Sequence, residues 1–589
     1  MACRVEGRDT GPEWLGPGVA AASADGGTLF LACERSHQVV AVNLAAKATV
    51  RTFGLPESPT GVVVVQAEPS RLIVTCSGAS SSIVSLKPET GRVLASWAGE
   101  SGVCSPVLSG DGRALFVCNR YDNTVWRLRP DSGRVLARAT VAREPVSASL
   151  SGDGKCLAVA SLLPTGPANR PVVAAAVTLL DARNLRLLRT VCLPNGSTLV
   201  RAVAFHPERQ LCAVVHNIAH FQGAATQVEH GWMNTSALSL VWTEAGGKAV
   251  AVVLDEARRG AANPSSVAWS PDGRQLCIAH AGTHELSIID FKALEQKLAA
   301  VPAGQVVGDF SFLQGIRKRV TLGGNGPRAV VVAQGVACAA EFFSDSVSMV
   351  DLSTRSLAGV ISLSAGGPSD REREGERLFH DAAICHQGWQ SCASCHPEGR
   401  VDGLNWDLMN DGVGNPKNTR NLLLSCQTPP AMSLGIRETA EGAVRSGLRH
   451  ILFAKRPESE AAAMDAYLRS LRPMPSPRLK KGALSPSARR GKALFESART
   501  GCSTCHPPGL FTDLRAYDVG TRASCDKPSE QFDTPTLVEL WRTAPYLHDG
   551  SAATVRDVLT TRNAGDRHGR TAKLSRRQVE DLCAYLLSL

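Results

Sequence analysis

The chain has 589 residues, 43% of them hydrophobic, and a formal net charge of +10. This length exceeds what one hydrophobic core supports, so we expect three or four domains. No run approaches the 18 apolar residues of a membrane-spanning helix, and none is expected. The positive charge is spread over both halves, which favours a solvated surface over a nucleic-acid or membrane patch and leaves room for an acidic redox partner.

A short strand pattern recurs seven times in the first 365 residues, usually after a turn that contains glycine. Three of these turns carry Asp-Gly, which supplies the positive φ of a tight hairpin. Short strands at near-equal spacing, with no helical pattern between them, indicate propeller blades rather than a sandwich. The units resemble seven-bladed propellers of the YVTN type over residues 18–365. They start at Gly26, Ser70, Gly112, Gly154, Arg209, Gly273 and Gly335.

Cysteines recur at similar places in these strand-like runs. We expect them to be small buried apolar side chains rather than a disulfide framework. They are Cys33, Cys76, Cys118, Cys156, Cys212, Cys277 and Cys338.

The loop at residues 216–237 is rich in histidine. Such a loop can bind a metal or face a cofactor, but it is more often a surface loop packed on a neighbouring domain. The propeller shows no convincing catalytic cluster elsewhere, so its predicted task is to present a docking face. The loop's notable side chains are His216, His220, His230, Trp232 and Met233.

The pattern turns helical after a Gly-Gly-Pro-Ser linker at Gly366, and two C-x-x-C-H runs follow. Such a run attaches a c-type haem: its two thiols add to the haem vinyl groups and its histidine supplies the proximal axial nitrogen. A thiol redox pair or half of a zinc site does not explain a histidine after both pairs. The predicted haem residues are Cys392, Cys395 and His396 in the first run, and Cys502, Cys505 and His506 in the second.

Both motifs lie between matching helix patterns, which indicates two tandem cytochrome c units. A Gly and a Leu-Phe pair precede each motif, and an Ala-Tyr-Leu pattern ends each unit. In such a unit the first and last helices cross over the haem. The predicted architecture is therefore an all-β seven-bladed propeller (1–365) followed by two all-α haem domains (366–480 and 481–589).

The sixth ligands of the two irons are less well defined. The second unit has no methionine after Cys505, and it offers His548 and His568 instead. His568 lies 17 residues before Tyr585, and His450 lies 17 residues before the matching tyrosine of the first unit. This equal spacing predicts that His450 and His568 are equivalent distal residues. A turn histidine is the alternative at both places, and Met432 and Met464 compete in the first unit.

The haem region resembles the bacterial di-haem cytochrome c peroxidase and methylamine-utilisation family over residues 369–589. The likeness is strongest in Asp533–Leu559, around the Thr-Ala-Pro-Tyr-x-His-Asp-Gly-Ser core. The resemblance implies two haems, one of them open or weakly ligated, that reduce hydrogen peroxide or carry out oxidations. Relatives often hold a calcium ion between the haem domains. Where they carry a Met or Tyr ligand for the second haem, this chain has Arg562-Asn563, which puts the usual ligand and potential in doubt.

The resemblance also implies a distal acid in the first unit and a tryptophan relay. Glu441 or Glu438 could be the acid, although solvent-facing glutamates on a helix are commoner. Trp406 could carry electrons between the haems, although simple packing is commoner for a tryptophan.

Three hypotheses follow. The first is a peroxidase-like haem oxidoreductase whose partners are a redox protein or hydrogen peroxide. The second is an electron carrier with both irons six-coordinate, and the third places substrate chemistry in the propeller. Haem attachment outside the bacterial cytoplasm predicts a periplasmic or otherwise exported protein. Met1–Ala20 has no apolar leader core, so we expect a leader that this N-terminus does not show.

Overall fold

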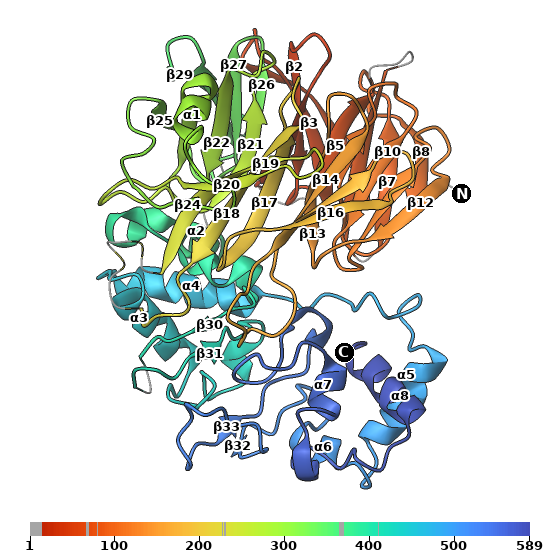
Figure 1. The fold of residues 1–589 in the computed structure, drawn as a ribbon. Coiled ribbons are helices and arrows are strands. Elements are labelled where there is room, and N and C mark those ends of the chain that lie inside the picture. Colours follow the sequence, from red (N-terminus) through yellow and green to blue (C-terminus); the bar gives the residue numbers. More distant parts are fainter. Residues whose placement is uncertain are drawn as a thin grey trace.

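The computed structural model describes residues 14–65, 70–78, 80–225, 228, 231, 233–364, 370–409 and 412–589. Outside the described residues lie most of Met1–Ala20, the linker that begins at Gly366, and two notable residues of the histidine-rich loop, His230 and Trp232. The strands gather in one half of the molecule and the helical region forms the other half (Figure 1).

Within the described residues, the N-terminal half forms seven sheets, each with four antiparallel strands, and one of them carries an additional parallel strand that is described below. The first strands of neighbouring sheets pack on one another, and β1 closes the ring against β26. The predicted seven-bladed propeller is therefore confirmed.

Each blade is built in the same order. The inner strands are β1 (Pro17–Ala22), β5 (Pro59–Val65), β9 (Val103–Leu108), β13 (Pro145–Leu150), β17 (Ser197–Phe205), β21 (Pro264–Trp269) and β26 (Pro327–Ala333). The middle strands are β2 (Thr28–Cys33), β3 (Gln38–Asn43), β6 (Arg71–Ser77), β7 (Ser81–Leu86), β10 (Leu115–Asn119), β11 (Thr124–Leu128), β14 (Cys156–Ser161), β15 (Ala176–Asp181), β18 (Leu211–Ala219), β19 (Asn234–Trp242), β22 (Gln275–His280), β23 (Glu285–Asp290), β27 (Val336–Glu341) and β28 (Ser346–Asp351). The outer strands are β4 (Ala48–Gly54), β8 (Val93–Ala98), β12 (Val135–Thr140), β16 (Leu187–Cys192), β20 (Ala249–Val253), β25 (Arg317–Thr321) and β29 (Ser356–Ser362).

The recurring sequence pattern corresponds to the second strand of every blade. These strands are nearly continuous apolar runs because both of their faces are covered by neighbouring blades. The seven predicted cysteines are free and buried there. Burial without a compensating charge raises the pKa of each thiol; that of Cys76, for example, rises to about 12. They are core side chains, as predicted.

The later blades carry insertions that lengthen the repeat. Between β23 and β25 the chain forms a helix, α1 (Phe291–Leu298), and then β24 (Val306–Val307), which pairs in parallel with β20. The repeat pattern predicts no helix between the strands. Asp290 caps α1, and Phe291, Leu294 and Leu298 are buried against the adjoining blades. These apolar residues lie on one face of the helix, a pattern that the strand repeat does not reveal.

The helical half contains two similar pairs of crossing helices, α2 (Arg371–His380) with α4 (Glu458–Ser470), and α5 (Pro486–Phe495) with α8 (Arg576–Leu586). A glycine permits each crossing. A Cβ on Gly375 would lie 1.9 Å from the Ala463 carbonyl oxygen, and one on Gly491 would lie 1.9 Å from that of Asp581. The shorter elements are α3 (Ala440–His450), α6 (Cys502–Cys505), α7 (Val555–Leu559), and the pairs β30 (Asn405–Trp406) with β31 (Lys417–Asn418) and β32 (Ala516–Tyr517) with β33 (Phe532–Asp533).

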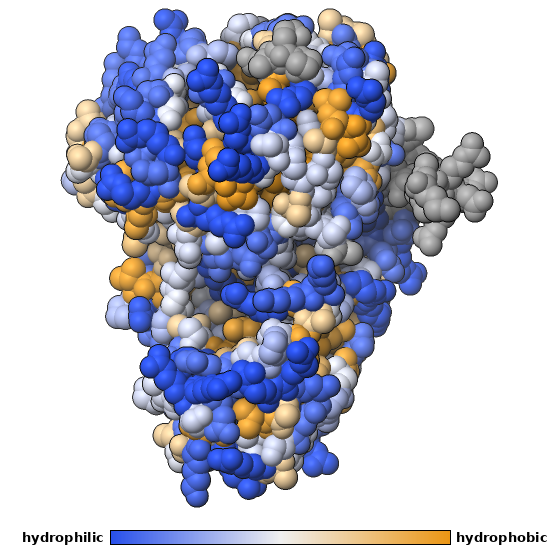
Figure 2. Space-filling model, turned by 90° about the vertical axis from the view of Figure 1, so that its right-hand side faces the viewer, coloured by the Kyte–Doolittle hydropathy of each residue, from blue (hydrophilic) through white to orange (hydrophobic). Residues whose placement is uncertain are grey.

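Apolar side chains form several separate patches on the face shown in Figure 2, and hydrophilic residues lie between them. No helix in the described ranges is long and apolar enough to cross a bilayer. We call residues 370–472 the first motif region and residues 485–589 the second motif region.

Candidate haem sites

Both C-x-x-C-H motifs form one short helical turn. In the first, the His396 amide donates to the Cys392 carbonyl at 2.9 Å, and in the second the His506 amide donates to the Cys502 carbonyl at 3.0 Å. The same backbone hydrogen bond therefore places the histidine one turn after the first cysteine in both motifs. The two sites share the local geometry that their shared sequence predicts.

Each motif histidine is oriented by a backbone carbonyl. His396 Nδ1 lies 3.2 Å from the Arg400 oxygen, and His506 Nδ1 lies 2.8 Å from the Phe511 oxygen. A proton on Nδ1 is held by that carbonyl, which leaves the Nε2 lone pair available to a metal. Burial lowers the pKa of both rings, that of His396 to about 4, so both are neutral near pH 7. The donor set fits an axial haem ligand.

The second motif faces another histidine. The rings of His506 and His568 have centroids 6.5 Å apart and planes at 39°. Two metal–nitrogen bonds of about 2 Å, with about 1 Å from each nitrogen to its ring centre, would separate the centroids by about 6 Å. Desolvation lowers the pKa of His568 to about 4, and its Nδ1 is buried with no hydrogen-bond partner among the residues that the structure describes. The pair therefore has the spacing and the neutral nitrogens needed to hold one iron.

Asn563 holds the loop that presents His568. Its Oδ1 accepts from the His568 amide at 2.8 Å, and its Nδ2 donates to the Gly569 carbonyl and to Thr571 Oγ1 at 2.8 and 2.7 Å. Asn563, at the position where relatives carry a Met or Tyr ligand, therefore holds the loop of His568 instead. The sequence indicates that the usual ligand is missing, but only the hydrogen bonds reveal this role of Asn563.

The first motif has a different distal side. His450 is exposed at the end of α3, and no ring contact joins His396 to a second histidine within the described residues. Met464 packs in an apolar cluster with Leu378 and Leu448, and Met432 is half-buried. His450 is exposed whereas His568 lies against a motif histidine, so the two residues do not occupy equivalent positions. Ligation of the first haem by His450 stays a prediction.

His548, the other histidine offered by the second unit, joins the two motif regions. Its Nε2 lies 2.7 Å from Asp526 Oδ2, its ring stacks on Phe532 at 3.6 Å, and its carbonyl accepts from the Asn418 amide at 2.7 Å. His548, the histidine of the Thr-Ala-Pro-Tyr-x-His-Asp-Gly-Ser core, is therefore a buried packing residue that links the two motif regions.

Trp406 lies in the apolar cluster that includes Cys395 and Leu404. Its Nε1 donates to Asp402 Oδ2 at 2.8 Å. Burial raises the pKa of Asp402 to about 6, and hydrogen bonds from Thr419 and Trp406 oppose that rise. The packing role of Trp406 is evident, and its proposed relay role stays a prediction.

Glu441 occupies the first turn of α3, where its carboxylate pairs with Arg469. Partial burial opposes its ionisation, but a backbone amide and Arg469 lower its pKa overall. Val444 lies one turn further along α3 and packs against the cluster that contains Cys392. Glu438 is exposed before the helix. Of the two predicted acids, Glu441 is the one on a helix that packs against the first motif.

The histidine-rich loop packs on the first motif region. His216 is buried in the blade, with Nε2 2.8 Å from Ser239 Oγ, and His220 contacts Thr235. Met233 Sδ accepts from Gln390 Nε2 at 3.2 Å. The described part of the loop therefore fits the interpretation of a packed loop. In the described chain, no cluster of three His, Cys, Asp or Glu side chains could hold a metal ion.

No family model matches the chain. It is 32% identical to hydrazine synthase subunit gamma of Kuenenia stuttgartiensis, over 38% of this chain and 78% of that protein. It is 26% identical to the methylamine utilization protein MauG of Methylophilus methylotrophus, over 36% and 81%. It is also 26% identical to the cytochrome-c peroxidase IdrP1 of Denitromonas iodatirespirans, over 38% and 81%.

A solved hydrazine synthase chain of Kuenenia stuttgartiensis superposes with a TM-score of 0.52 at 20% identity, covering 59% of this chain and 99% of that one. This likeness shows the fold alone. The relatives support a haem redox function and covalently bound haem c. The chain therefore belongs to the family of hydrazine synthase subunit gamma, MauG and the di-haem cytochrome c peroxidases, and joins such a region to a seven-bladed propeller.

Proposed function

We propose that this chain is an exported, peroxidase-like oxidoreductase with two c-type haems, one closed and one reactive. The observation that carries this proposal is the contrast between the motif histidines. His506 faces His568, whereas His396 has no second histidine ring against it among the described residues. Two such unlike sites suit a division between electron entry and chemistry.

The second motif region would hold the electron-transfer haem. Cys502 and Cys505 would attach it, and His506 and His568 would supply both axial nitrogens. When bound, haem iron supplies one-electron redox chemistry, and two neutral imidazoles leave no position for a substrate. Asn563 keeps the distal loop closed through three hydrogen bonds.

The first motif region would hold the reactive haem, attached by Cys392 and Cys395 with His396 as proximal ligand. Reduction of hydrogen peroxide to two waters takes up two electrons and two protons. Arg469 keeps Glu441 ionised, so that this carboxylate can accept a proton as peroxide binds and return it later. In this scheme Trp406, packed in the cluster of Cys395, lies on the electron path.

A second candidate is an electron carrier with both irons six-coordinate. The closed His506–His568 pair and the engagement of Glu441 by Arg469 favour it. In that case the first iron would take its sixth ligand from a residue such as Met432.

Low-temperature EPR of the ferric, haem-loaded protein tests the choice. A high-spin signal beside a low-spin one in the ferric protein supports the reactive first haem. Two low-spin signals in the ferric protein, with the haem that is still ferric after half-reduction remaining low-spin, support the carrier. Peroxidase turnover with a reduced cytochrome or dye should fall with Glu441→Gln and persist with the control Glu438→Gln. Turnover of a small substrate by a haem-free variant would move the chemistry to the propeller.

Export rests on the chemistry of covalent haem attachment, and cell fractionation of the haem-loaded protein checks it. A periplasmic location is expected, and haem-loaded protein found only in the cytoplasm would contradict it. Calcium between the motif regions stays a prediction, checked by metal analysis of purified protein.

A further inference from the structure

A propeller side chain completes the turn that carries the first haem motif. Asn263, in the loop before β21, donates from Nδ2 to Ser391 Oγ at 2.8 Å and accepts at Oδ1 from Ser394 Oγ at 2.7 Å. Ser391 and Ser394 also form the capping box of this turn. The turn between the two haem-binding cysteines is therefore capped jointly by its own serines and by the propeller.

A second propeller residue reaches one of the haem-binding thiols. Asn234, buried at the start of β19, donates from Nδ2 to Gln390 Oε1 at 3.0 Å, and the same nitrogen lies 3.7 Å from Cys395 Sγ. Gln390 in turn donates to the Ile451 carbonyl at 3.1 Å. The propeller thus contacts this segment on both sides of the first motif cysteine.

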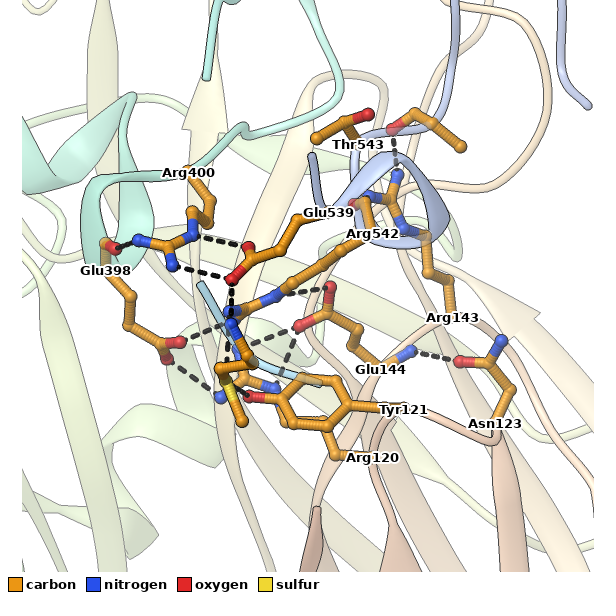
Figure 3. A network of polar contacts seen from close by, with 12 residues as sticks. Arg120, Tyr121, Asn123, Arg143, Glu144, Glu398, Arg400, Glu539, Arg542 and Thr543 are labelled. Atoms are coloured by element: carbon orange, nitrogen blue, oxygen red, sulfur yellow. Dashed lines mark hydrogen bonds and ion pairs between the residues drawn. The ribbon is translucent and has the colours of Figure 1, made fainter. Parts of the chain in front are cut away.

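An ion pair between the two motif regions fixes Arg400, whose backbone carbonyl orients His396. Arg400 accepts from the His396 ring through its carbonyl, while its guanidinium forms two hydrogen bonds to Glu539, at 2.8 and 2.9 Å (Figure 3). Glu539 is fully buried, and Arg400 is 6% exposed. A buried bidentate pair of this kind fixes both the position and the direction of the arginine.

This pair belongs to a network that extends into the propeller (Figure 3). Glu398 accepts from Arg120 at 2.8 Å and from Arg542 at 2.5 Å, and Arg120 also pairs with Glu144 at 2.8 Å. Arg143 donates to the Arg542 carbonyl at 2.6 Å. Charges from the propeller and both motif regions therefore meet beside the segment that follows His396. Removing one buried partner would leave an uncompensated charge.

The second motif has no such support from the described part of the propeller. Its turn starts at Gly501, with φ 72° and no side-chain cap. His506 is oriented by Phe511 of its own region. The apolar cluster against which Cys502 packs consists of buried residues of its own region.

We propose that the propeller is a built-in part of the first haem centre. Asn263 of the propeller fixes the attachment turn, and Glu539 of the second motif region fixes the Arg400 carbonyl that orients His396. Both are positioning residues, so the reduction potential of the first haem depends on the propeller contact and on this ion pair. Among the described residues the second motif has neither contact, so the potential of the second haem does not depend on them. This inference rests on the proposal that both motifs carry haem. It also gives the propeller face a use within the chain, in place of docking an outside partner.

Two variants of the full haem-loaded chain test the proposal. Asn263→Gly removes the capping side chain while keeping a residue that tolerates the observed φ of 56°. Glu539→Gln keeps the shape but weakens the pair with Arg400. Asn43→Gly, at the partly buried end of β3 in the first blade, and Glu295→Gln, in an exposed ion pair with Arg209, are matched controls.

The measurement is haem content, followed by potentiometric titration with EPR to resolve the two haems. We expect each variant to change the reduction equilibrium of the first haem about tenfold, which is about 59 mV for one electron. The second haem and both controls should be unchanged.

An unchanged first haem in Asn263→Gly, whatever Glu539→Gln does, or equal shifts of both haems in Asn263→Gly, would overturn the proposal. If Glu539→Gln leaves a charge buried and fails to fold, the neutral Asn263→Gly decides alone. Fewer than two haems in the unmodified protein would instead refute the proposed function.

Discussion

The two motif regions repeat one scaffold but differ around their histidines. Both cross two helices at a glycine and pack a phenylalanine on a tyrosine, with Phe379–Tyr467 centroids 5.2 Å apart and Phe495–Tyr585 centroids 5.3 Å apart. The second region places His568 against His506, whereas the motif turn of the first region is hydrogen-bonded to Asn263 of the propeller. In this duplication the helix crossing stays the same while the loops that surround the cofactor change.

Helix length explains why equal sequence spacing gives unequal positions. In the first region α3 continues for 11 residues and ends at His450, which is exposed. In the second, α7 ends after 5 residues and the chain turns through Asn563, which brings His568 inward. A histidine at the same spacing therefore lies at a helix end in one copy and in an inward loop in the other.

Removing the thioether attachments of one region at a time has the largest expected effect. Paired Cys→Ser changes at Cys392 and Cys395, or at Cys502 and Cys505, should each reduce haem from two to one per chain. The pyridine haemochrome spectrum of denatured protein measures this number. Two haems retained in either variant would show that the motif is not an attachment site.

The distal histidines should respond differently. His568→Ala should convert a low-spin haem signal to high spin, because it removes one axial nitrogen of the second site. If the first haem is open, as proposed, His450→Ala at an exposed position should leave the EPR spectrum unchanged, whereas ligation by His450 predicts a new high-spin signal. A changed spectrum with His450→Ala would restore the equivalence that the spacing predicts.

Asn563→Ala should weaken the second site without removing its ligand. It loses three hydrogen bonds, at about 1 kcal/mol each, and frees the His568 loop. We expect lower stability in thermal unfolding and a partial high-spin signal. Asn184→Ala, in an exposed turn, is the control. An unchanged spin state would mean that other contacts hold the loop.

The smallest expected effect is a change in pH dependence at the first site. Burial raises the pKa of Asp402 to about 6, above its unfolded value, so its stabilising contribution falls as pH rises from about 4 to about 6. Asp402→Asn should flatten the Tm profile in this window. Asp351→Asn should leave the slope unchanged, because a hydrogen bond from Ser353 and others lower the pKa of Asp351 to about 2. An unchanged slope in Asp402→Asn would contradict the assignment.

Much of this protein follows from short-range sequence signals. The seven strand repeats predicted the propeller because each blade forms from consecutive strands. The two C-x-x-C-H runs predicted the haem motifs because the thiols and histidine need only a fixed local spacing. The matching helix patterns predicted the two units and their crossing helices, and the structure shows that a glycine without Cβ permits each close approach.

Tertiary structure decided what surrounds each motif. Asn263 and Asn234 lie more than a hundred residues before the turn they hold, and nothing local to them signals that contact. Helix ends likewise decided which histidine turns inward. Sequence by itself determined the repeating units and the attachment chemistry, since both depend on neighbouring residues. The environment of each haem site depends on contacts between blades, helices and loops that meet only in the folded chain.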